Sequence, residues 1–429
     1  MEICVIGAGY VGLTSAAVLA DLGHSVYCLD TCADKISSLM KGKVPIFEPG
    51  LETLIQKNHA RLTFSTPTVE IIQKAPIILI AVGTPSSPSG QTDLTYVKSA
   101  IELIAGQLTS YKTIITKSTV PPGTNESICT MLIEKGVDRK NFNIVSNPEF
   151  LREGTAISDM IKPDKIVVGL EKGDHKSLQI IQEMYQKITA PYIVTTLSGA
   201  EMIKYTSNAF LALKISFINE IARICDQYQV KIDDVVKGIS TDPRIGPHFL
   251  RAGIGYGGSC FPKDIRSLAY CALEKNIRPV LLQATEDVNQ TQVDFYIDKL
   301  KAVIPDLSAK IIAVLGIAFK PNTDDTRYSP ALSLIEKLSG LGCQIRAYDP
   351  EAHLPDPFKA SVVGKFSVKE AVSGADVVII ATDWDEFNHL NWAEMKKWMN
   401  GEWIVDARNC IDPQTIRQQG LQYLGVARS

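Results

Sequence analysis

The N-terminal half of the chain alternates short apolar runs with amphipathic segments. The runs have Gly, Pro, Asp or Thr near their ends and read EICVIGAG, SVYCLD, APIILIAVGTP, KTIITKSTV and NFNIVSNPEF, and DKIVVGL and PYIVTT extend the pattern. Apolar runs of this length, separated by helical patterns, are typical of buried parallel strands connected by helices. The alternation therefore predicts an α/β fold class with a doubly wound parallel sheet.

The pattern changes near Leu197. Residues 198–229 contain no proline and carry apolar side chains at helical spacing, which predicts a single long helix. A helix of about 30 residues exceeds the usual globular length, so we expect it to connect domains or to pair with a second copy. Helical patterns continue to about residue 300, and a second alternating set follows: KIIAVLGIAF, CQIRAYD, ADVVIIATDW and EWIVDARN. The predicted organisation is an α/β domain (1–196), a helical segment (197–300) and a second α/β domain (301–429).

The composition of the chain limits the kinds of molecule that we expect the protein to bind. The 429 residues carry a formal net charge of −3 and no long basic block, which argues against binding to nucleic acid or to an anionic membrane. No apolar run is long enough to span a bilayer, and the N-terminus lacks the basic region of a signal peptide. The nine cysteines are scattered without paired or zinc-binding spacing, so we expect reduced thiols in the cytoplasm and no metal site.

The hexapeptide GAGYVG places Gly7, Gly9 and Gly12 directly after an apolar run and before a helical pattern. In a Rossmann-like domain, glycines at this spacing allow a tight turn, the approach of a pyrophosphate, and close packing of helix on strand. Asp30 ends the next run, where a carboxylate binds ribose hydroxyls and repels a 2′-phosphate. The sequence predicts bound NAD in preference to NADP, with FAD as the minor alternative.

A glycine-rich segment, AGIGYGGSCFPKD, surrounds Cys260. Ser259 can cap a helix and Pro262 suits a first helical turn, so we expect Cys260 at a helix N-terminus, where the pKa of a thiol is lowered. Lys263 adds positive charge, and Asp264 lies one helical turn from the thiol. Glycines around the thiol would allow a bulky ligand to approach: Gly255, Gly257 and Gly258. The alternative is a flexible loop around an ordinary cysteine.

Other polar residues stand where they can converge on a site. Thr84 and Thr119 follow apolar runs at the edge of the predicted sheet where ligands bind. Lys204 and Asn208 share one face of the predicted long helix and could donate hydrogen bonds to a developing oxyanion. Glu149 and Glu153 are also four residues apart. For both pairs the alternative is a solvated helical surface. After the run ending at Leu315–Gly316, Lys320 and Arg327 could bind phosphates, although the glycine fingerprint is incomplete there.

Seven motifs occur together and in order: GAGYVG, VGTP, STVPPGT, NPEFLREG, EMIKYTSNAFLALKISFINE, DPRIGPHFLRAGIGYGGSCFPKD and GIAFKPNTDDTR. With them the chain resembles the UDP-glucose/GDP-mannose dehydrogenase family over nearly its whole length. No position that carries chemistry departs from the family pattern, whereas beyond about Ser329 the likeness is looser. The resemblance implies an NAD-binding Rossmann domain, a central dimer-forming helical domain that carries the cysteine loop, and a C-terminal Rossmann-like domain for the uridine nucleotide.

The resemblance also implies an NAD-dependent four-electron oxidation of UDP-glucose to UDP-glucuronate. C6 is first oxidised to an aldehyde, Cys260 captures the aldehyde as a thiohemiacetal, a second oxidation gives a thioester, and water releases the acid. In this scheme Lys204 and Asn208 stabilise the oxyanion and Asp264 positions or activates water. Thr119, Glu149 and Glu153 line the reacting centre. A cytoplasmic homodimer and a role in polysaccharide biosynthesis are implied as well.

The implied contacts form two sets. The cofactor set comprises Gly7, Gly9, Val11, Gly12, Asp30, Lys35, Thr84, Thr119, Glu153, Lys263 and Arg327. The substrate set comprises Glu149, Phe150, Leu151, Arg152, Glu153, Lys204, Asn208, Arg244 from a partner subunit, Phe249, Leu250, Arg251, Gly253, Gly257 and Lys320.

Three alternatives stay open from the sequence. One is a sibling dehydrogenase that acts on GDP-mannose or a UDP-N-acetylhexosamine. Another is a non-catalytic NAD-binding sensor, against which the joint presence of Cys260, Lys204, Asn208 and Asp264 argues. The last is a two-electron dehydrogenase in which Cys260 is only structural.

Overall fold

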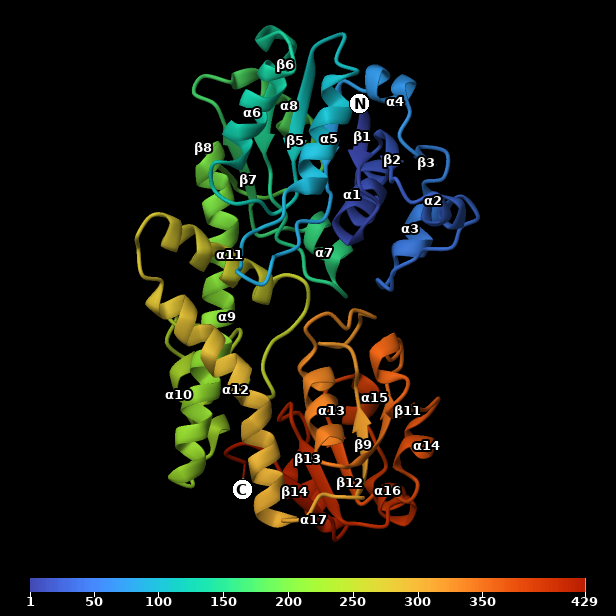
Figure 1. The fold of residues 1–429 in the computed structure, drawn as a ribbon, viewed down its shortest axis with the longest axis vertical. Coiled ribbons are helices and arrows are strands. Elements are labelled where there is room, and N and C mark those ends of the chain that lie inside the picture. Colours follow the sequence, from blue (N-terminus) through green and yellow to red (C-terminus); the bar gives the residue numbers. More distant parts are fainter. Residues whose placement is uncertain (429) are drawn as a thin grey trace. The chain divides into compact units, whose positions relative to one another are not determined.

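A computed structural model describes residues 1–428 (Figure 1). The chain forms two compact units. The N-terminal unit comprises Met1–Ser207 and Arg266–Lys275, and the C-terminal unit comprises Asn208–Ile265 and the chain from Asn276 onward. Each unit is built around its own sheet.

The N-terminal unit contains an eight-stranded sheet in the order β3-β2-β1-β4-β5-β6-β7-β8. The strands are β1 (Glu2–Ile6), β2 (Ser25–Leu29), β3 (Leu62–Ser65), β4 (Ile77–Ile80), β5 (Lys112–Thr116), β6 (Phe142–Ser146), β7 (Ile166–Leu170) and β8 (Tyr192–Thr196). The first six strands are parallel and have the doubly wound order 3-2-1-4-5-6. The seven strands expected in this half are confirmed, and β3 is an additional one.

Successive residues of a strand point to opposite faces of the sheet, and both faces are buried. Ile3 and Val5 belong to one apolar cluster, whereas Cys4 and Ile6 belong to another. Burial on both faces explains why the runs are apolar throughout. The helices of this unit include α1 (Tyr10–Asp21), α2 (Ala33–Met40), α3 (Leu51–Lys57), α4 (Val69–Lys74), α5 (Thr95–Ala105), α6 (Thr124–Glu134), α7 (Ala156–Ile161) and α8 (His175–Met184), with a 3-10 turn at Arg139–Asn141.

The sheet departs from parallel pairing at one place. β7 pairs antiparallel with β6 through Ser146 and Gly169, and β8 then pairs parallel with β7. Between β6 and β7 the chain forms only the six-residue helix α7. Parallel neighbours need a long crossover connection, whereas a shorter return places the next strand antiparallel.

The C-terminal unit has a six-stranded parallel sheet in the order β11-β10-β9-β12-β13-β14. The strands are β9 (Ile311–Leu315), β10 (Gln344–Tyr348), β11 (Val362–Gly364), β12 (Val377–Ile380), β13 (Trp403–Asp406) and β14 (Gln422–Leu424). The four expected strands are confirmed, and the three-residue strands β11 and β14 are additional. This sheet repeats the doubly wound order of the first.

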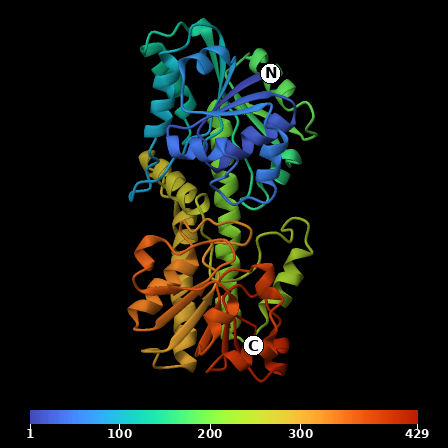
Figure 2. The same cartoon turned by 90° about the vertical axis from the view of Figure 1, so that its right-hand side faces the viewer.

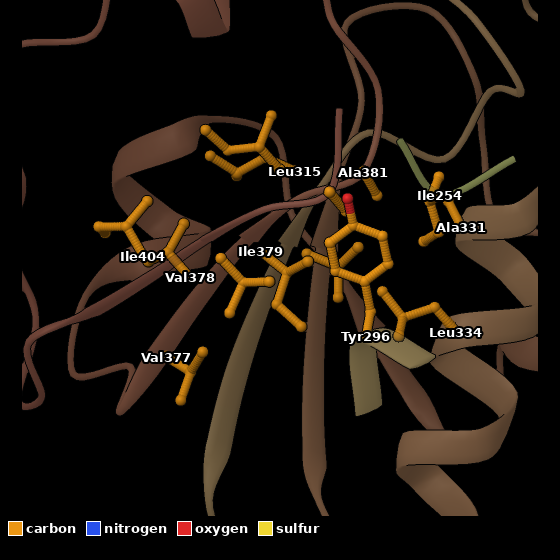
Figure 3. Packing of buried hydrophobic residues seen from close by; sticks show 14 of the residues in the cluster. Ile254, Tyr296, Leu315, Ala331, Leu334, Val377, Val378, Ile379, Ala381 and Ile404 are labelled. Carbon is orange, nitrogen blue, oxygen red and sulfur yellow. The ribbon is translucent and has the colours of Figure 1, made fainter. Parts of the chain in front are cut away.

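Helices pack on the second sheet around one apolar core. They are α13 (Pro330–Gly340), α14 (Val368–Val372), α15 (Asp385–Asn388), α16 (Trp392–Trp398) and α17 (Pro413–Gln418), with a 3-10 turn at Asp356–Phe358. Figure 3 shows part of this core, in which the ring of Tyr296 lies among Leu334, Ile379 and other apolar side chains. The Tyr296 hydroxyl is buried without a hydrogen-bond partner, and burial raises the pKa of Tyr296 well above its ordinary value.

The central helices are α9 (Leu197–Gln227), α10 (Ile232–Ser240), α11 (Phe261–Glu274) and α12 (Val280–Val303). The predicted long helix is confirmed as α9, which has 31 residues and is drawn as one continuous helix in Figure 2. Both α9 and α11 contain residues of each compact unit, so the segment 197–300 contributes to both. The boundaries at 196/197 and 300/301 stay a prediction.

Candidate active site

The turn from β1 to α1 has the geometry that the glycine spacing predicts. Gly7 has φ +106°, and a Cβ there would lie 2.6 Å from the carbonyl oxygen of Ala81. A Cβ at Gly12 would lie 1.8 Å from the carbonyl oxygen of Gly7. A Cβ at Gly9 would meet nothing within 4 Å. Gly7 and Gly12 are therefore required by the turn and by packing, whereas Gly9 leaves an open face at the N-terminus of α1.

Asp30 follows β2 and faces this turn. Its carboxylate accepts hydrogen bonds from the backbone of Ala8 and Cys32, each 2.9 Å long, and pairs with Lys35 Nζ at 2.9 Å. Burial acts to raise the pKa of Asp30, but the bonds from Cys32, Lys35 and Ala8 outweigh it and lower the pKa. Asp30 is therefore a carboxylate at neutral pH. Val11 lies on the first turn of α1, half-buried against the core.

The loops after β4 and β5 are bonded together beside this turn. Thr84 Oγ1 donates to the carbonyl of Thr119 at 2.8 Å, and Ser118 Oγ donates to the carbonyl of Val82 at 2.7 Å. Because β1, β4 and β5 are adjacent and parallel, their carboxyl ends form one edge of the sheet. The structure brings the glycine turn, Thr84 and Thr119 to that edge, where ligands bind in sheets of this kind.

Glu149 and Lys204 form a buried ion pair in the N-terminal unit. Lys204 Nζ lies 2.9 Å from Glu149 Oε1, and their side chains are 3 % and 5 % exposed. Glu149 Oε2 also accepts the backbone N–H of Leu151 at 2.8 Å, and the Phe150 ring lies 5.3 Å from Lys204 Nζ. The alternative of a solvated surface is wrong for these residues and for Glu153, which is also buried. Sequence reasoning missed the pairing itself.

Arg152 is placed differently from its neighbours. It is exposed, and its guanidinium forms hydrogen bonds of 3.0 and 2.7 Å with the carboxylate of Asp159. To contact a ligand, the Arg152 guanidinium would have to leave the Asp159 carboxylate or bind both groups.

Asn208 and Asp264 form the corresponding buried pair in the C-terminal unit. Asn208 Nδ2 donates to Asp264 Oδ2 at 2.6 Å, and the other carboxylate oxygen pairs with Lys263. Asp264 is 1 % exposed and Asn208 is 6 % exposed, so a solvated helical surface is wrong here too. Asn208 follows Lys204 by one turn of α9. The helix thus carries two adjacent hydrogen-bond donors, each held by a buried carboxylate.

Cys260 stands directly before α11, as expected. Its carbonyl oxygen accepts the N–H of Asp264 at 2.9 Å, the first bond of the helix, and its side chain is half-buried. Anionic groups are stabilised at this end of a helix. All nine cysteines are thiols. Burial raises the pKa of Cys4 to about 12, which marks that thiol as inert.

The glycines around Cys260 require a correction. Protein atoms occupy the space into which side chains at these positions would project, so that space is not open to a ligand. A Cβ at Gly257 would lie 2.2 Å from the carbonyl oxygen of Tyr328, and a Cβ at Gly258 would lie 2.6 Å from the Phe319 ring. A Cβ at Gly255, where φ is +108°, would lie 2.5 Å from Asn289 Oδ1. The glycines therefore let the loop pack closely against the rest of the C-terminal unit.

Arg408 follows β13 and holds the same loop, a function that sequence reasoning missed. Its guanidinium donates to the carbonyl of Gly255 at 3.0 Å, of Phe319 at 2.6 Å and of Ala381 at 2.7 Å. Three loops are thereby joined at one side chain. An arginine two residues after an apolar strand was the available sequence signal, but the sequence does not indicate which carbonyl groups it binds.

The segment before the cysteine loop contains the other predicted substrate residues. Phe249 has φ +62° and Leu250 is buried, while the Gly253 N–H donates to Asn219 Oδ1 at 2.8 Å. Arg251 pairs with Asp383 at 2.8 Å and is 65 % exposed. Arg244 is exposed and bonded to Asp242.

The loop after β9 has a backbone arrangement similar to that of the turn between β1 and α1. Gly316 has φ +103°, and Asp349 Oδ2 accepts the N–H groups of Ile317 and Ala318 at 2.7 and 3.0 Å, as Asp30 accepts that of Ala8. Lys320 is half-buried beside Phe319. The Arg327 guanidinium donates hydrogen bonds of 2.9, 3.0 and 2.8 Å to the carboxylate of Asp325.

The part of the chain that the structure describes contains neither a metal-binding cluster nor a membrane-spanning helix. In residues 1–428, no three side chains of His, Cys, Asp or Glu gather so that they could hold a metal ion. Over the same range, no helix is long and apolar enough to cross a membrane.

Comparison with known proteins covers the whole chain. Residues 1–189 match the NAD binding domain of the UDP-glucose/GDP-mannose dehydrogenase family, residues 198–291 its central domain, and residues 313–413 its UDP binding domain. A protein from Bacillus subtilis (strain 168), YtcA, which is named provisionally as a UDP-glucose 6-dehydrogenase, is 49 % identical over 428 residues and covers 100 % of both chains.

Two solved structures of nucleotide-sugar dehydrogenases are similar to this chain over its whole length. A UDP-glucose dehydrogenase from Pyrobaculum islandicum has a TM-score of 0.91 at 34 % identity, covering 100 % of this chain and 98 % of that one. A UDP-D-ManNAc dehydrogenase from Pyrococcus horikoshii has a TM-score of 0.88 at 29 % identity, covering 100 % and 99 %. With all three family domains matched in order, the protein is an NAD-dependent oxidoreductase that belongs to the UDP-glucose/GDP-mannose dehydrogenase family.

Proposed function

We propose that this UDP-sugar dehydrogenase acts on UDP-glucose and oxidises its C6 alcohol to the carboxylate of UDP-glucuronate. The observation that carries the proposal is Cys260, which stands at the first turn of α11 with its carbonyl bonded to the N–H of Asp264. A nucleophile is what a four-electron oxidation needs, because covalent capture of an aldehyde makes a second oxidation possible.

The residues of the first turn fit NAD. Gly9 leaves open space at the N-terminus of α1, and Asp30 is held as a carboxylate beside it. When bound, NAD accepts a hydride from C6 in each of the two oxidations, so two molecules are reduced per sugar. The proposed contacts are Gly7, Gly9, Val11, Gly12, Asp30, Lys35, Thr84, Thr119, Glu153, Lys263 and Arg327.

Cys260 acts between the two oxidations. Its thiolate forms a C–S bond to the C6 aldehyde, and the resulting alkoxide takes up a proton to give a thiohemiacetal. Oxidation of that carbon leaves a thioester, and attack by water breaks the C–S bond, which releases the carboxylic acid and restores the thiol. The N-terminus of α11 stabilises the thiolate as nucleophile and as leaving group.

Lys204 and Asn208 are suited to hold the oxygen on C6. Both are donors fixed by buried carboxylates, Glu149 and Asp264 respectively. Donors that are held before the reaction stabilise a developing oxyanion without reorganisation. Asp264 is also the carboxylate that we propose for positioning the hydrolytic water, while Thr119 and Glu153 line the reacting centre.

The nucleotide sugar is proposed to contact the remaining residues of the substrate set: Phe150, Leu151, Arg152, Phe249, Leu250, Arg251, Gly253, Gly257 and Lys320, with Arg244 supplied by a partner subunit. Arg244 and Arg327 each pair with an aspartate two residues away. Binding of a diphosphate would therefore exchange one anion for another at such guanidinium groups.

The oligomeric state, the domain boundaries and the location of the protein are further proposals. We propose a cytoplasmic homodimer formed through α9 and three domains at 1–196, 197–300 and 301–429. Exposed aromatic side chains along α9 support the dimer.

UDP-N-acetylhexosamines are the second candidate substrate class, because one structural match is a UDP-D-ManNAc dehydrogenase. Turnover on UDP-glucose, UDP-N-acetylmannosamine and GDP-mannose separates the candidates. We expect UDP-glucose to give the highest kcat/KM, and a preference for another sugar would contradict the proposed substrate.

Stoichiometry and one substitution test the mechanism. We expect two NADH per UDP-glucuronate, and Cys260→Ala should abolish acid formation while the affinity for UDP and NAD stays within about twofold, because the nucleotide contacts do not involve sulfur. Cys260→Ser should also be severely impaired, since a hydroxyl is a far weaker nucleophile than a thiolate. Cys271→Ala, on the same helix, is the matched control. Near wild-type turnover of Cys260→Ala would show that the loop contains no nucleophile.

A further inference from the structure

Glu48 is a buried carboxylate in the loop between α2 and α3. It is 6 % exposed. Its oxygens accept the backbone N–H of Gly154 at 2.6 Å and of Ala156 at 2.8 Å. It also accepts the hydroxyl of Tyr10. One side chain therefore meets two distant segments of the N-terminal unit.

Tyr10 is the first residue of α1 and belongs to the glycine fingerprint. Its hydroxyl donates to Glu48 and accepts the N–H of Gly154 at 2.8 Å. Tyr10, Glu48 and the Gly154 amide thus form a closed set of three hydrogen bonds. This set joins the N-terminus of α1, where the dinucleotide binds, to the chain directly after Glu153.

The chain that is held in this way has no regular structure of its own. Residues 147–155 lie between β6 and α7 and form neither helix nor strand. Such a segment lacks the repeating hydrogen bonds that position a strand or helix. The positions of Glu149 and Glu153 therefore depend on individual anchors, which are the Lys204–Glu149 and Arg152–Asp159 pairs within the segment and one anchor at each of its ends. β6 anchors the start of the segment. The hydrogen-bonded set of Tyr10, Glu48 and the Gly154 amide, here called the Glu48 cluster, anchors its end.

We propose that Glu48 is a positioning residue for the reaction. Through Tyr10 it holds the segment Glu149–Glu153 in a fixed position relative to α1, the helix whose N-terminus binds the dinucleotide. The proposal rests on the proposed function in one respect, that Glu149 and Glu153 line the reacting centre. Glu48 touches neither substrate nor cofactor in this proposal and acts through the Tyr10 hydroxyl and the backbone at Gly154 and Ala156.

A carboxylate suits this position better than any neutral acceptor. Three donors converge on its two oxygens. In Glu48→Gln one of those oxygens becomes an NH₂ group, which would face an N–H or O–H donor whichever way the amide is turned. A buried donor would then lack an acceptor, and the segment would shift to relieve it.

Tyr10→Phe is the mildest test, because it removes one oxygen and leaves the ring and the backbone of α1 in place. We expect kcat with UDP-glucose to fall about tenfold, since small displacements of reacting groups are costly. The dissociation constant for NAD should stay within about twofold, because the glycine turn binds through its backbone. Glu48→Gln should lower kcat further, by roughly 100-fold.

The double variant distinguishes positioning from simple destabilisation. If Tyr10 and Glu48 act as one unit, Tyr10→Phe/Glu48→Gln should be no slower than Glu48→Gln alone. Tyr96→Phe and Glu52→Gln are matched controls, because both residues are exposed in the same unit. All assays are run well below the measured Tm of each variant.

Three results would overturn the proposal: an unchanged kcat in Tyr10→Phe, a loss of kcat matched by an equal loss of NAD affinity, or additive effects in the double variant. If Glu48→Gln does not fold, Tyr10→Phe decides alone. Failure of the proposed function is a separate outcome, because wild-type protein would then not oxidise UDP-glucose at all.

Discussion

Lys117 is a buried lysine at the carboxyl end of β5, 5 % exposed, and its Nζ donates to two neutral oxygens of Asn147 at 3.1 and 3.2 Å. Burial lowers the pKa of Lys117 to about 8, while Glu149 acts to raise it and Lys204 to lower it further. A lysine in such surroundings costs stability whenever it is charged.

The sign of its pH dependence follows from proton binding. Below pH 8 both the folded and the unfolded chain carry the proton, so Lys117 contributes no slope. Between about 8 and 10.5 only the unfolded chain holds it, so the free energy of unfolding rises with pH. Relative to Lys117→Met, the wild type should gain about 1 to 2 kcal/mol from pH 8 to pH 9.5.

Thermal or urea unfolding followed by circular dichroism at both pH values measures the difference. Lys98→Met, at an exposed position of α5, is the control. Parallel pH profiles for the wild type and Lys117→Met would contradict the prediction. At pH 7, Lys117→Met should be at least as stable as the wild type, since it removes a buried charge.

At the scale of elements, α9 presents large apolar side chains to solvent at a seven-residue spacing. Phe210, Phe217 and Ile224 are 59 %, 50 % and 49 % exposed. Positions seven apart lie on one side of a helix. We propose that these exposed apolar side chains on one side of the long helix are the contact surface for a second copy of α9.

Phe217→Asp should weaken the dimer roughly tenfold or more, because a charge would be buried in the centre of the interface. Light scattering across a concentration series measures the dissociation constant. Phe366→Asp, the same substitution at a 90 % exposed position of the C-terminal unit, is the control. A wild-type monomer at micromolar concentration would refute the dimer itself.

At the scale of the whole molecule, the two units have separate cores and are matched to separate nucleotide-binding domains. All four tryptophans lie in the C-terminal unit: Trp384, Trp392, Trp398 and Trp403. Tryptophan fluorescence therefore reports unfolding of the C-terminal unit, whereas circular dichroism reports both units.

We expect saturating UDP to raise the fluorescence-detected Tm by roughly 5 °C or more, since a ligand stabilises the unit that binds it. NAD should raise the Tm seen by circular dichroism and shift the fluorescence transition less, because of its proposed contacts only Lys263 and Arg327 lie in the C-terminal unit. Asp30→Ala should remove the effect of NAD and keep that of UDP. Equal shifts of both signals by either ligand would show that the chain unfolds as one cooperative unit.

Local features could be predicted from the sequence. The apolar runs became strands, the proline-free stretch became α9, and Cys260 stands at the start of α11. The roles of Gly7 and Gly12 were also readable, because a positive φ and close packing at a βα turn are properties of a few neighbouring residues. The short strands β3, β11 and β14 were not predicted, since each has only three or four residues and lacks the continuous four-residue apolar run of β4 or β12.

The contacts between distant segments were decided by the tertiary structure alone. The Lys204–Glu149 pair, the carbonyl partners of Arg408 and the Glu48 cluster each join segments that lie far apart in the chain. Gly257 and Gly258 read as open space for a ligand until Tyr328 and Phe319 were found to occupy it. Periodicity and capping residues in the sequence reflect the conformation of residues that are neighbours in the chain. The space beside a residue is filled by segments that can be distant in the chain, and the fold decides which segments those are. The amino-acid sequence by itself therefore determined most of the elements, the cofactor turn and the place of Cys260 at the start of a helix. The packing of those elements decided which side chains are held and which groups hold them.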